Sequence, residues 1–118
     1  MMSTMGVSTD LLKEISRNEG VDEEVLRRRV AAGRVVAPFN PVHSPRPCGI
    51  GEGLGVKINV NVGTSRDRVE IEEEMEKVEI ARRYGADAIM DLSTGGDIDA
   101  IRRRIIKDSD MPVGTVPI

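Results

Sequence analysis

The sequence is poor in the residues that build redox, metal and aromatic sites. Its 118 residues include one cysteine, Cys48, one histidine, His43, one Phe, one Tyr and no Trp. A single cysteine excludes an internal disulfide. No Cys or His cluster has the spacing of a zinc site or an iron–sulfur site. We therefore expect no metal ligand in this chain and assign it no catalytic residue.

Long apolar runs and an excess of positive charge are also absent. No stretch approaches the ~20 apolar residues of a membrane span. Acidic Asp10 and Glu14 interrupt the N-terminus where a signal peptide would be apolar. The net charge is −3, whereas nucleic acids and membrane surfaces usually attract basic patches. We expect a cytoplasmic protein with no membrane or nucleic-acid partner.

What is present divides the chain into three regions. Residues 1–37 predict an N-terminal helical segment of two short helices, the second capped by Asp22, followed by a short strand at Val35 and Val36. Residues 38–55 hold four prolines and four glycines. Because proline removes a backbone donor and glycine loosens the backbone, we expect a loop there with neither helix nor strand.

Residues 56–118 read as the start of a (β/α)8 barrel, in the order β-α-β-α-β. Such an order calls for a parallel sheet with helical crossovers. The expected elements are a strand at Val56–Val62, a helix at Arg68–Tyr84, a strand at Asp87–Leu92, a helix capped by Asp97, and a strand at Met111–Ile118. The fold class is therefore α/β, although three strands are too few to close a barrel.

The first of these helices carries many charges. Pairs Glu73–Lys77 and Glu79–Arg83 stand at i,i+4 spacing, which favours ion pairs along an exposed helix face. The run Glu72–Glu74 is interpreted as a solvated face rather than a metal site.

Two strands of this region carry polar residues that a buried parallel strand would normally lack. Lys57, Asn59 and Asn61 alternate with apolar residues and should share one face. They indicate either a hydrogen-bonded structural network or a ligand site, and the pattern favours neither. Asp91 within an apolar strand is either a carboxylate held by neighbouring donors or a substrate contact.

Residues 15–34 offer a competing interpretation. Their pattern of two short helices joined by a turn is that of a helix-turn-helix motif with a basic second helix. However, the basic run Arg27–Arg29 is balanced by the acidic run Asp22–Glu24. A DNA-binding or regulatory role stays an alternative on this pattern.

Four segments carry a resemblance to a known family. They are KINVNVGTS (57–65), IEEEMEKVEIARRYGAD (71–87), MDLSTGGD (90–97) and PVGTVPI (112–118). In this order and spacing they resemble phosphomethylpyrimidine synthase, the ThiC family. GVDEEVLRRRVAAGRVV and GIGEG resemble its upstream part. The similarity covers nearly the whole chain, with Val60 where the family commonly has alanine.

The resemblance implies an activity and its cofactors. The family converts aminoimidazole ribonucleotide into hydroxymethylpyrimidine phosphate in thiamine biosynthesis. It uses S-adenosylmethionine, a [4Fe-4S] cluster and a divalent metal, zinc. The resemblance also implies that the full-length protein is a homodimer. By resemblance, Asn61 and Met90 contact the substrate. Strand alternation leaves open whether Met90 or Asp91 faces the barrel interior.

The resemblance also implies missing parts. The family's next substrate tyrosine, its metal-binding histidines and its cluster cysteines lie beyond Ile118. We therefore expect a truncated N-terminal portion of a synthase that is inactive alone. The alternatives are a non-catalytic ribonucleotide-binding module, a helix-turn-helix-like regulatory module, or a piece that complements a second polypeptide.

Overall fold

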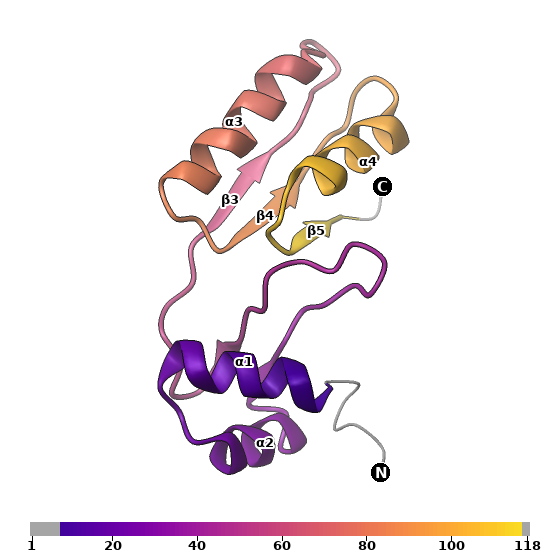
Figure 1. Cartoon of the computed structure of the whole chain (residues 1–118). Helices are drawn as coiled ribbons and strands as arrows, with labels where there is room; N and C mark the ends of the chain where they lie inside the picture. The colour runs from indigo at the N-terminus through magenta and orange to yellow at the C-terminus, as the bar shows by residue number, and fades with distance from the viewer. Residues whose placement is uncertain (1–7, 117–118) are drawn as a thin grey trace. The chain divides into compact units, whose positions relative to one another are not determined.

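The computed structural model describes residues 8–116 and separates them into two compact units. The first unit comprises the chain up to Phe39 together with Pro47–Val56. The second comprises Asn40–Arg46 and the chain from Lys57 onward. Figure 1 labels the helices of both units and the strands of the second unit.

Two helices form most of the first unit. Helix α1 (Thr9–Glu19) begins after Ser8, whose hydroxyl accepts the N–H of Leu11, and α2 (Glu23–Ala31) begins after Asp22, whose carboxylate accepts the N–H of Val25. These caps satisfy donors that a helix start leaves open. The predicted helix pair and the Asp22 cap are confirmed. The core of this unit is made of Leu11, Leu12, Ile15, Leu26, Val30 and Val35.

A small antiparallel ladder completes this unit and corrects one expectation. Strand β1 (Val35–Val36) was predicted, but β2 (Ile50–Gly51) lies in the Pro/Gly-rich region where no strand was expected. A Cβ on Gly51 would lie 2.8 Å from the Cα of Val35, and Gly51 has φ +142°. Glycine thus permits a close backbone approach here, so the residue type that indicated a loop instead enables pairing.

The second unit is a three-stranded parallel sheet with two helices. Its strands β3 (Asn59–Val62), β4 (Ala88–Asp91) and β5 (Val113–Thr115) are neighbours in chain order. Helices α3 (Ile71–Arg83) and α4 (Ile98–Asp108) connect them. Both pairings are parallel, which confirms the expected sheet. The Asp97 cap is confirmed too, since its carboxylate accepts the N–H of Ala100.

Most elements are shorter than predicted. Val56 and Ile58 are exposed and precede β3, and no ladder partner fixes Val56 as strand. Helix α3 starts at Ile71 because Ser65 and Arg68 close a turn by mutual backbone hydrogen bonds. Strand β5 starts after Pro112, which has no N–H to donate. The end of the predicted third strand, residues 117–118, lies outside the described residues.

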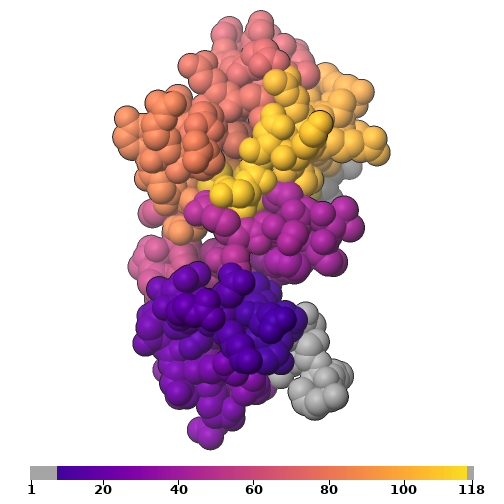
Figure 2. Space-filling view, in the orientation of Figure 1, coloured from indigo at the N-terminus to yellow at the C-terminus, as the bar shows by residue number. Residues whose placement is uncertain are grey.

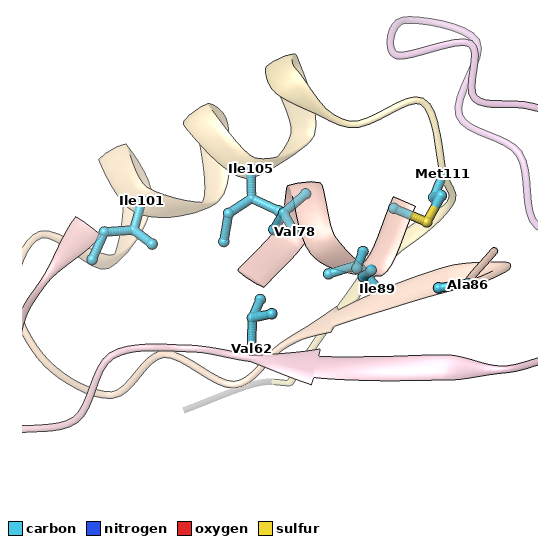
Figure 3. Packing of buried hydrophobic residues seen from close by; sticks show 8 residues of the cluster. Val62, Val78, Ala86, Ile89, Ile101, Ile105 and Met111 are labelled. Carbon is cyan, nitrogen blue, oxygen red and sulfur yellow. The ribbon is translucent and has the colours of Figure 1, made fainter. Parts of the chain in front are cut away.

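Both helices cover the same face of the sheet. Ile101 and Ile105 point from α4 toward Val62 and Ile89 of the strands, while Val78 adds the contact from α3 (Figure 3). In the space-filling view the side chains of α3 and α4 close over the sheet on this side (Figure 2). The α/β class is therefore established, with one layer of helices on one layer of strands.

The charges on α3 pair differently from the expected i,i+4 pattern. Lys77 pairs with Glu74, and Arg82 with Glu79, both at i,i+3 spacing. Glu73 instead pairs with Arg68, which precedes the helix. Glu74 is only 4% exposed, so the interpretation of Glu72–Glu74 as a solvated face is wrong for its last member.

Candidate functional site

The face of the sheet opposite the helices carries the two residues assigned to substrate. Asn61 of β3, Met90 of β4 and Gly114 of β5 stand side by side in the parallel register. Val62 and Ile89, their chain neighbours, are buried against the helices. Because successive side chains alternate between faces, Asn61 and Met90 project from the opposite, open face. The structure thus brings the two predicted site residues together on adjacent strands.

Asn59 precedes Asn61 on the same face and contacts it directly. Its side-chain nitrogen donates to the side-chain oxygen of Asn61 at 3.1 Å, and both residues are exposed. The hydrogen bond agrees with the structural-network alternative, and the ligand-site alternative stays a prediction for two asparagines that also present polar atoms on an open surface. A pair of amides offers both donors and acceptors to a polar ligand.

The third member of this row, Gly114, controls the space around Met90. A Cβ built on Gly114 would lie 3.1 Å from Cε and 3.2 Å from Sδ of Met90. The methionine thioether therefore lies over the glycine of the next strand. A polarizable, apolar group beside two amides suits a ligand with a flat ring and polar edges.

The orientation of Met90 and Asp91, left open by the sequence, is decided by the register. Asp91 is fully buried on the helix side of the sheet, where its carboxylate accepts the N–H and the hydroxyl of Ser93. Met90 is half-buried on the open side with Asn61. No bulge is required, because simple alternation places the two residues on opposite faces.

Beyond their last paired residues, β3 and β4 stay joined by side-chain bonds. The N–H of Thr64 donates to the hydroxyl of Ser93 at 3.1 Å, and the hydroxyl of Thr64 donates to the carbonyl of Gly95 at 2.6 Å. All three residues are buried. These bonds hold the carboxyl ends of two neighbouring strands together, at the edge where parallel sheets place their ligand sites.

Two glycines allow this close contact. Gly63 has φ +149°, and a Cβ there would lie 2.6 Å from the backbone nitrogen of Ser93. A Cβ on Gly95 would overlap the carbonyl oxygen of Ser65. The two post-strand segments therefore touch backbone to backbone, which only residues without a side chain permit.

The residues present do not fit an iron–sulfur cluster. Cys48 is the only cysteine in the sequence and is buried. A [4Fe-4S] cluster held by cysteine needs three or four thiolates. Among residues 8–116, no group of three or more His, Cys, Asp and Glu side chains could hold a metal ion. In the same described part of the chain, no helix is long and apolar enough to cross a membrane.

His43 and the arginines of α2 have structural contacts. The Nε2 atom of His43 lies 2.6 Å from the carbonyl oxygen of Ser109. Arg27 pairs with Glu23 and Glu24, which raises the pKa of its guanidinium through those hydrogen bonds. Arg28 pairs with Glu24 as well. The basic helix of the helix-turn-helix cadence thus has acidic partners of its own.

Sequence reasoning missed three residues that shape the site. Glu74 accepts the N–H of Gly63 at 2.7 Å, just after β3. Arg102 of α4 lies beside Asp91, and Gly114 receives the side chain of Met90. Glu74 and Arg102 each lie in a run of residues of the same charge. Only the rotation of α3 and of α4, each about its axis, shows which residue of each run points toward the sheet. Gly114 could have been found by aligning the three strands in register.

Comparison with known proteins supplies an independent finding. The model of a family described as the radical SAM ThiC family matches residues 1–118. The chain is 50% identical over 113 residues to a phosphomethylpyrimidine synthase of Methanococcus maripaludis strain C6, covering 96% of this chain and 26% of the relative. For proteins of the same name from Thermodesulfovibrio yellowstonii and Pyrococcus abyssi, identities are 50% over 117 and 53% over 114 residues. These matches cover 99% and 96% of this chain, and 28% and 27% of the relatives. The chain spans about a quarter of the length of the curated relatives it matches.

Proposed function

Since this chain belongs to the radical SAM ThiC family, we propose that it is the N-terminal portion of a phosphomethylpyrimidine synthase. The reaction proposed for the complete enzyme converts aminoimidazole ribonucleotide into hydroxymethylpyrimidine phosphate. In that enzyme the residues of this chain bind part of the substrate and do not generate the radical. By itself the chain is inactive, because it has one cysteine and a cluster requires several.

The parallel unit is proposed to be the beginning of a (β/α)8 barrel. Its three strands are neighbours in chain order, and both helices cover one face of the sheet. Right-handed crossovers between strands added in one direction put both helices on one face, as in a barrel, where every helix lies outside. In the barrel the open face that carries Asn61 and Met90 becomes the interior.

An apolar hollow beside β3 supports the same proposal. It has a volume of about 400 Å³, and its lining residues are Ile58, Val60, Asn61, Lys77, Ile80, Ala81, Tyr84 and Ala86. Strand β3 is at the edge of the sheet, and Ile58, Ile80 and Tyr84 are exposed. Soluble proteins rarely leave such a strand edge and apolar flank uncovered. A further strand and helix of a longer polypeptide would cover both.

One observation carries the substrate assignment. Asn61 and Met90, 29 positions apart in the sequence, are register partners on the open face of adjacent strands. The asparagine offers an amide to the polar edge of an imidazole, and the methionine offers a thioether to its ring. We assign both to substrate binding, no residue of this chain to catalysis, and none to a metal.

The remaining components of the complete enzyme lie outside this chain. The proposed cofactors are S-adenosylmethionine, a [4Fe-4S] cluster and zinc, none of them bound by residues of this chain alone. The complete enzyme is proposed to be a cytoplasmic homodimer that has no nucleic-acid or membrane partner. The chain's own residues orient the ribonucleotide.

A segment exchange tests this proposal. The matching 28% of the Thermodesulfovibrio yellowstonii relative is replaced by this chain, and turnover of aminoimidazole ribonucleotide is measured anaerobically. We expect an active chimera, loss of turnover with Asn61→Ala, and normal turnover with Asn18→Ala, an exposed asparagine of α1. A folded, cluster-loaded chimera in which Asn61→Ala is as active as Asn18→Ala contradicts the assignment of Asn61.

A further inference from the structure

A buried polar network lies directly behind the proposed substrate residues. Asp91 and Ser93 are completely buried, and Thr64 is 3% exposed. The Asp91 Oδ1 atom accepts the hydroxyl of Ser93 at 2.6 Å, and that hydroxyl accepts the N–H of Thr64 at 3.1 Å. The apolar core of the unit adjoins these groups on the helix side. Polar groups in such a place are costly unless they are satisfied.

Arg102 extends the network to the third strand. Its Nε atom lies 3.3 Å from Oδ2 of Asp91, and one of its terminal nitrogens donates to the carbonyl of Val116 at 3.1 Å. Among the described residues, Asp91 Oδ2 and Arg102 Nε have no aligned hydrogen-bond partner, so the contact between them is an ion pair. One arginine of α4 thus connects the end of β4 with the residue that follows β5.

Residues of the buried network and residues of the proposed site occupy neighbouring positions along the same strands. Asp91 follows Met90, and Thr64 lies three residues beyond Asn61. Because side chains alternate in a strand, fixing Asp91 on the helix side also fixes Met90 on the open side. The bond from Ser93 to Thr64 then fixes the end of β3 relative to β4. The rotation and register of the two substrate-facing side chains therefore depend on Asp91 and its partner.

Stability alone does not explain a charged pair here. A buried ion pair is often no more stable than apolar residues of similar volume, although each charge is costly once its partner is removed. The directional bonds of a carboxylate and a guanidinium can instead specify one geometry for three strand ends.

We propose that Asp91 and Arg102 are positioning residues for the ribonucleotide, holding Asn61, Met90 and the end of β5 in the binding arrangement. This proposal rests on the proposed function, because it concerns the same substrate site. Neither residue touches the substrate. Both act from the opposite face of the sheet, through Ser93, Thr64 and the carbonyl of Val116.

The test separates positioning from stability by removing the charges without opening a cavity. In the 118-residue chain, Asp91→Asn with Arg102→Met keeps an acceptor for Ser93 and replaces the ion pair by a neutral pair. Asp91→Asn alone is the second variant, and it leaves the Arg102 guanidinium without its carboxylate partner. Arg104→Met is the matched control, because Arg104 lies on the same helix and pairs with Glu72 across exposed surface.

Two readouts are used, both well below the unfolding transition. Calorimetry measures the affinity for aminoimidazole ribonucleotide, and NMR follows the methyl signal of Met90 and the side-chain amide of Asn61. We expect the double variant to stay folded, to bind about tenfold more weakly, and to shift both signals. Asp91→Asn should also weaken binding and shift both signals, and Arg104→Met should change neither readout.

Each result has a defined meaning. Unchanged affinity and unchanged Met90 and Asn61 signals in the folded double variant would overturn the proposal and leave the pair a packing feature. Equal losses in Arg104→Met would overturn it as well. If the unsubstituted chain binds no ribonucleotide, the proposed function fails for this chain. The two NMR signals then decide the positioning role by themselves.

Discussion

Glu74 of α3 binds the backbone of Gly63, the residue that follows β3, through a 2.7 Å hydrogen bond from the glycine N–H to its carboxylate. The Lys77 ammonium also donates a hydrogen bond to each oxygen of this carboxylate, at 3.1 Å to Oε1 and 3.0 Å to Oε2. Glu74 thus joins α3 to the carboxyl end of β3. Its side chain is almost completely buried, with 4% of the residue exposed. The contact links α3 to the sheet edge that carries the candidate site.

Removing this carboxylate should destabilise the parallel unit. We expect Glu74→Ala to lower the free energy of unfolding by about 2 kcal/mol, because it leaves the partly buried N–H of Gly63 without its acceptor. Glu74→Gln keeps an acceptor and should cost less. Glu76→Ala, at an exposed position of the same helix, is the control and should be nearly neutral. Urea unfolding of the three variants measures the difference, and equal midpoints for Glu74→Ala and Glu76→Ala would contradict the expectation.

A side chain at position 114 should displace Met90. We expect Gly114→Ala to cost about 1 kcal/mol of stability, because the new methyl overlaps the Met90 thioether and a flexible side chain yields by a small shift. In a Met90→Ala background the same change should be almost free. A double-mutant cycle by thermal unfolding checks this. Additive effects would show that the two residues do not share this space.

The ion pairs of α3 give a predictable acid response. The pKa of Glu72 is lowered by its hydrogen bond with Arg104, that of Glu73 by Arg68, and that of Glu79 by Arg82, all from the ordinary value of 4.5. A carboxyl whose pKa is lower in the folded state stabilises the fold above its unfolded pKa. That contribution is lost as the pH falls through the folded value. We therefore expect the melting temperature to fall as the pH drops below about 4.5.

Salt and one substitution isolate this response. The pairs are exposed, so their contribution should be small and should shrink further at high ionic strength. Arg104→Gln should remove the contribution of Glu72. The melting temperature of this variant should therefore fall less steeply as the pH drops below about 4.5. Thermal melts between pH 7 and pH 3, at low and high salt, supply the data. A curve that is identical for Arg104→Gln and the unsubstituted chain would exclude Glu72 from the effect.

The chain should not assemble an iron–sulfur cluster. Only Cys48 is available as a thiolate, and it is buried. Anaerobic incubation with iron and sulfide should give no cluster absorbance above that of Cys48→Ser, the matched control. One cluster for every three or four chains, absent in Cys48→Ser, would prove the expectation wrong, because several chains would then share one cluster.

The sequence predicted the order of elements better than their limits. The periodicity of Ile101 and Ile105 identified α4, and alternation in NVNV identified β3, because each pattern reports one buried face. The limits failed where contacts outside the pattern decide. Val56 continues the β-type alternation, yet it lies beyond the ladder and is 91% exposed. The strand β2 could not be predicted, because its glycine allows pairing only with the particular backbone of Val35.

The geometry of the candidate site was also only partly accessible from the sequence. The assignment of Asn61 and Met90 to substrate came from resemblance and stays a prediction, and the parallel register places the two residues side by side. The sequence could not assign Asp91 to the helix side, because that requires the register with Val62. The contact of Arg102 with Asp91 could not be predicted either. Arg102 is one of three consecutive arginines, and only the rotation of α4 turns it rather than Arg103 toward Asp91.

The backbone contact between the segments after β3 and β4 limits how these positions can vary during evolution. Any codon change that adds a side chain at Gly63 or Gly95 must separate Ser93 from the end of β3 or move the turn at Ser65. Selection would therefore remove such changes whatever molecule the protein binds. Strict retention of these two glycines among relatives would reflect the geometry of chain packing. Under the proposed function, variation at Asn61 and Met90, whose side chains face open space, would instead indicate a change of ligand.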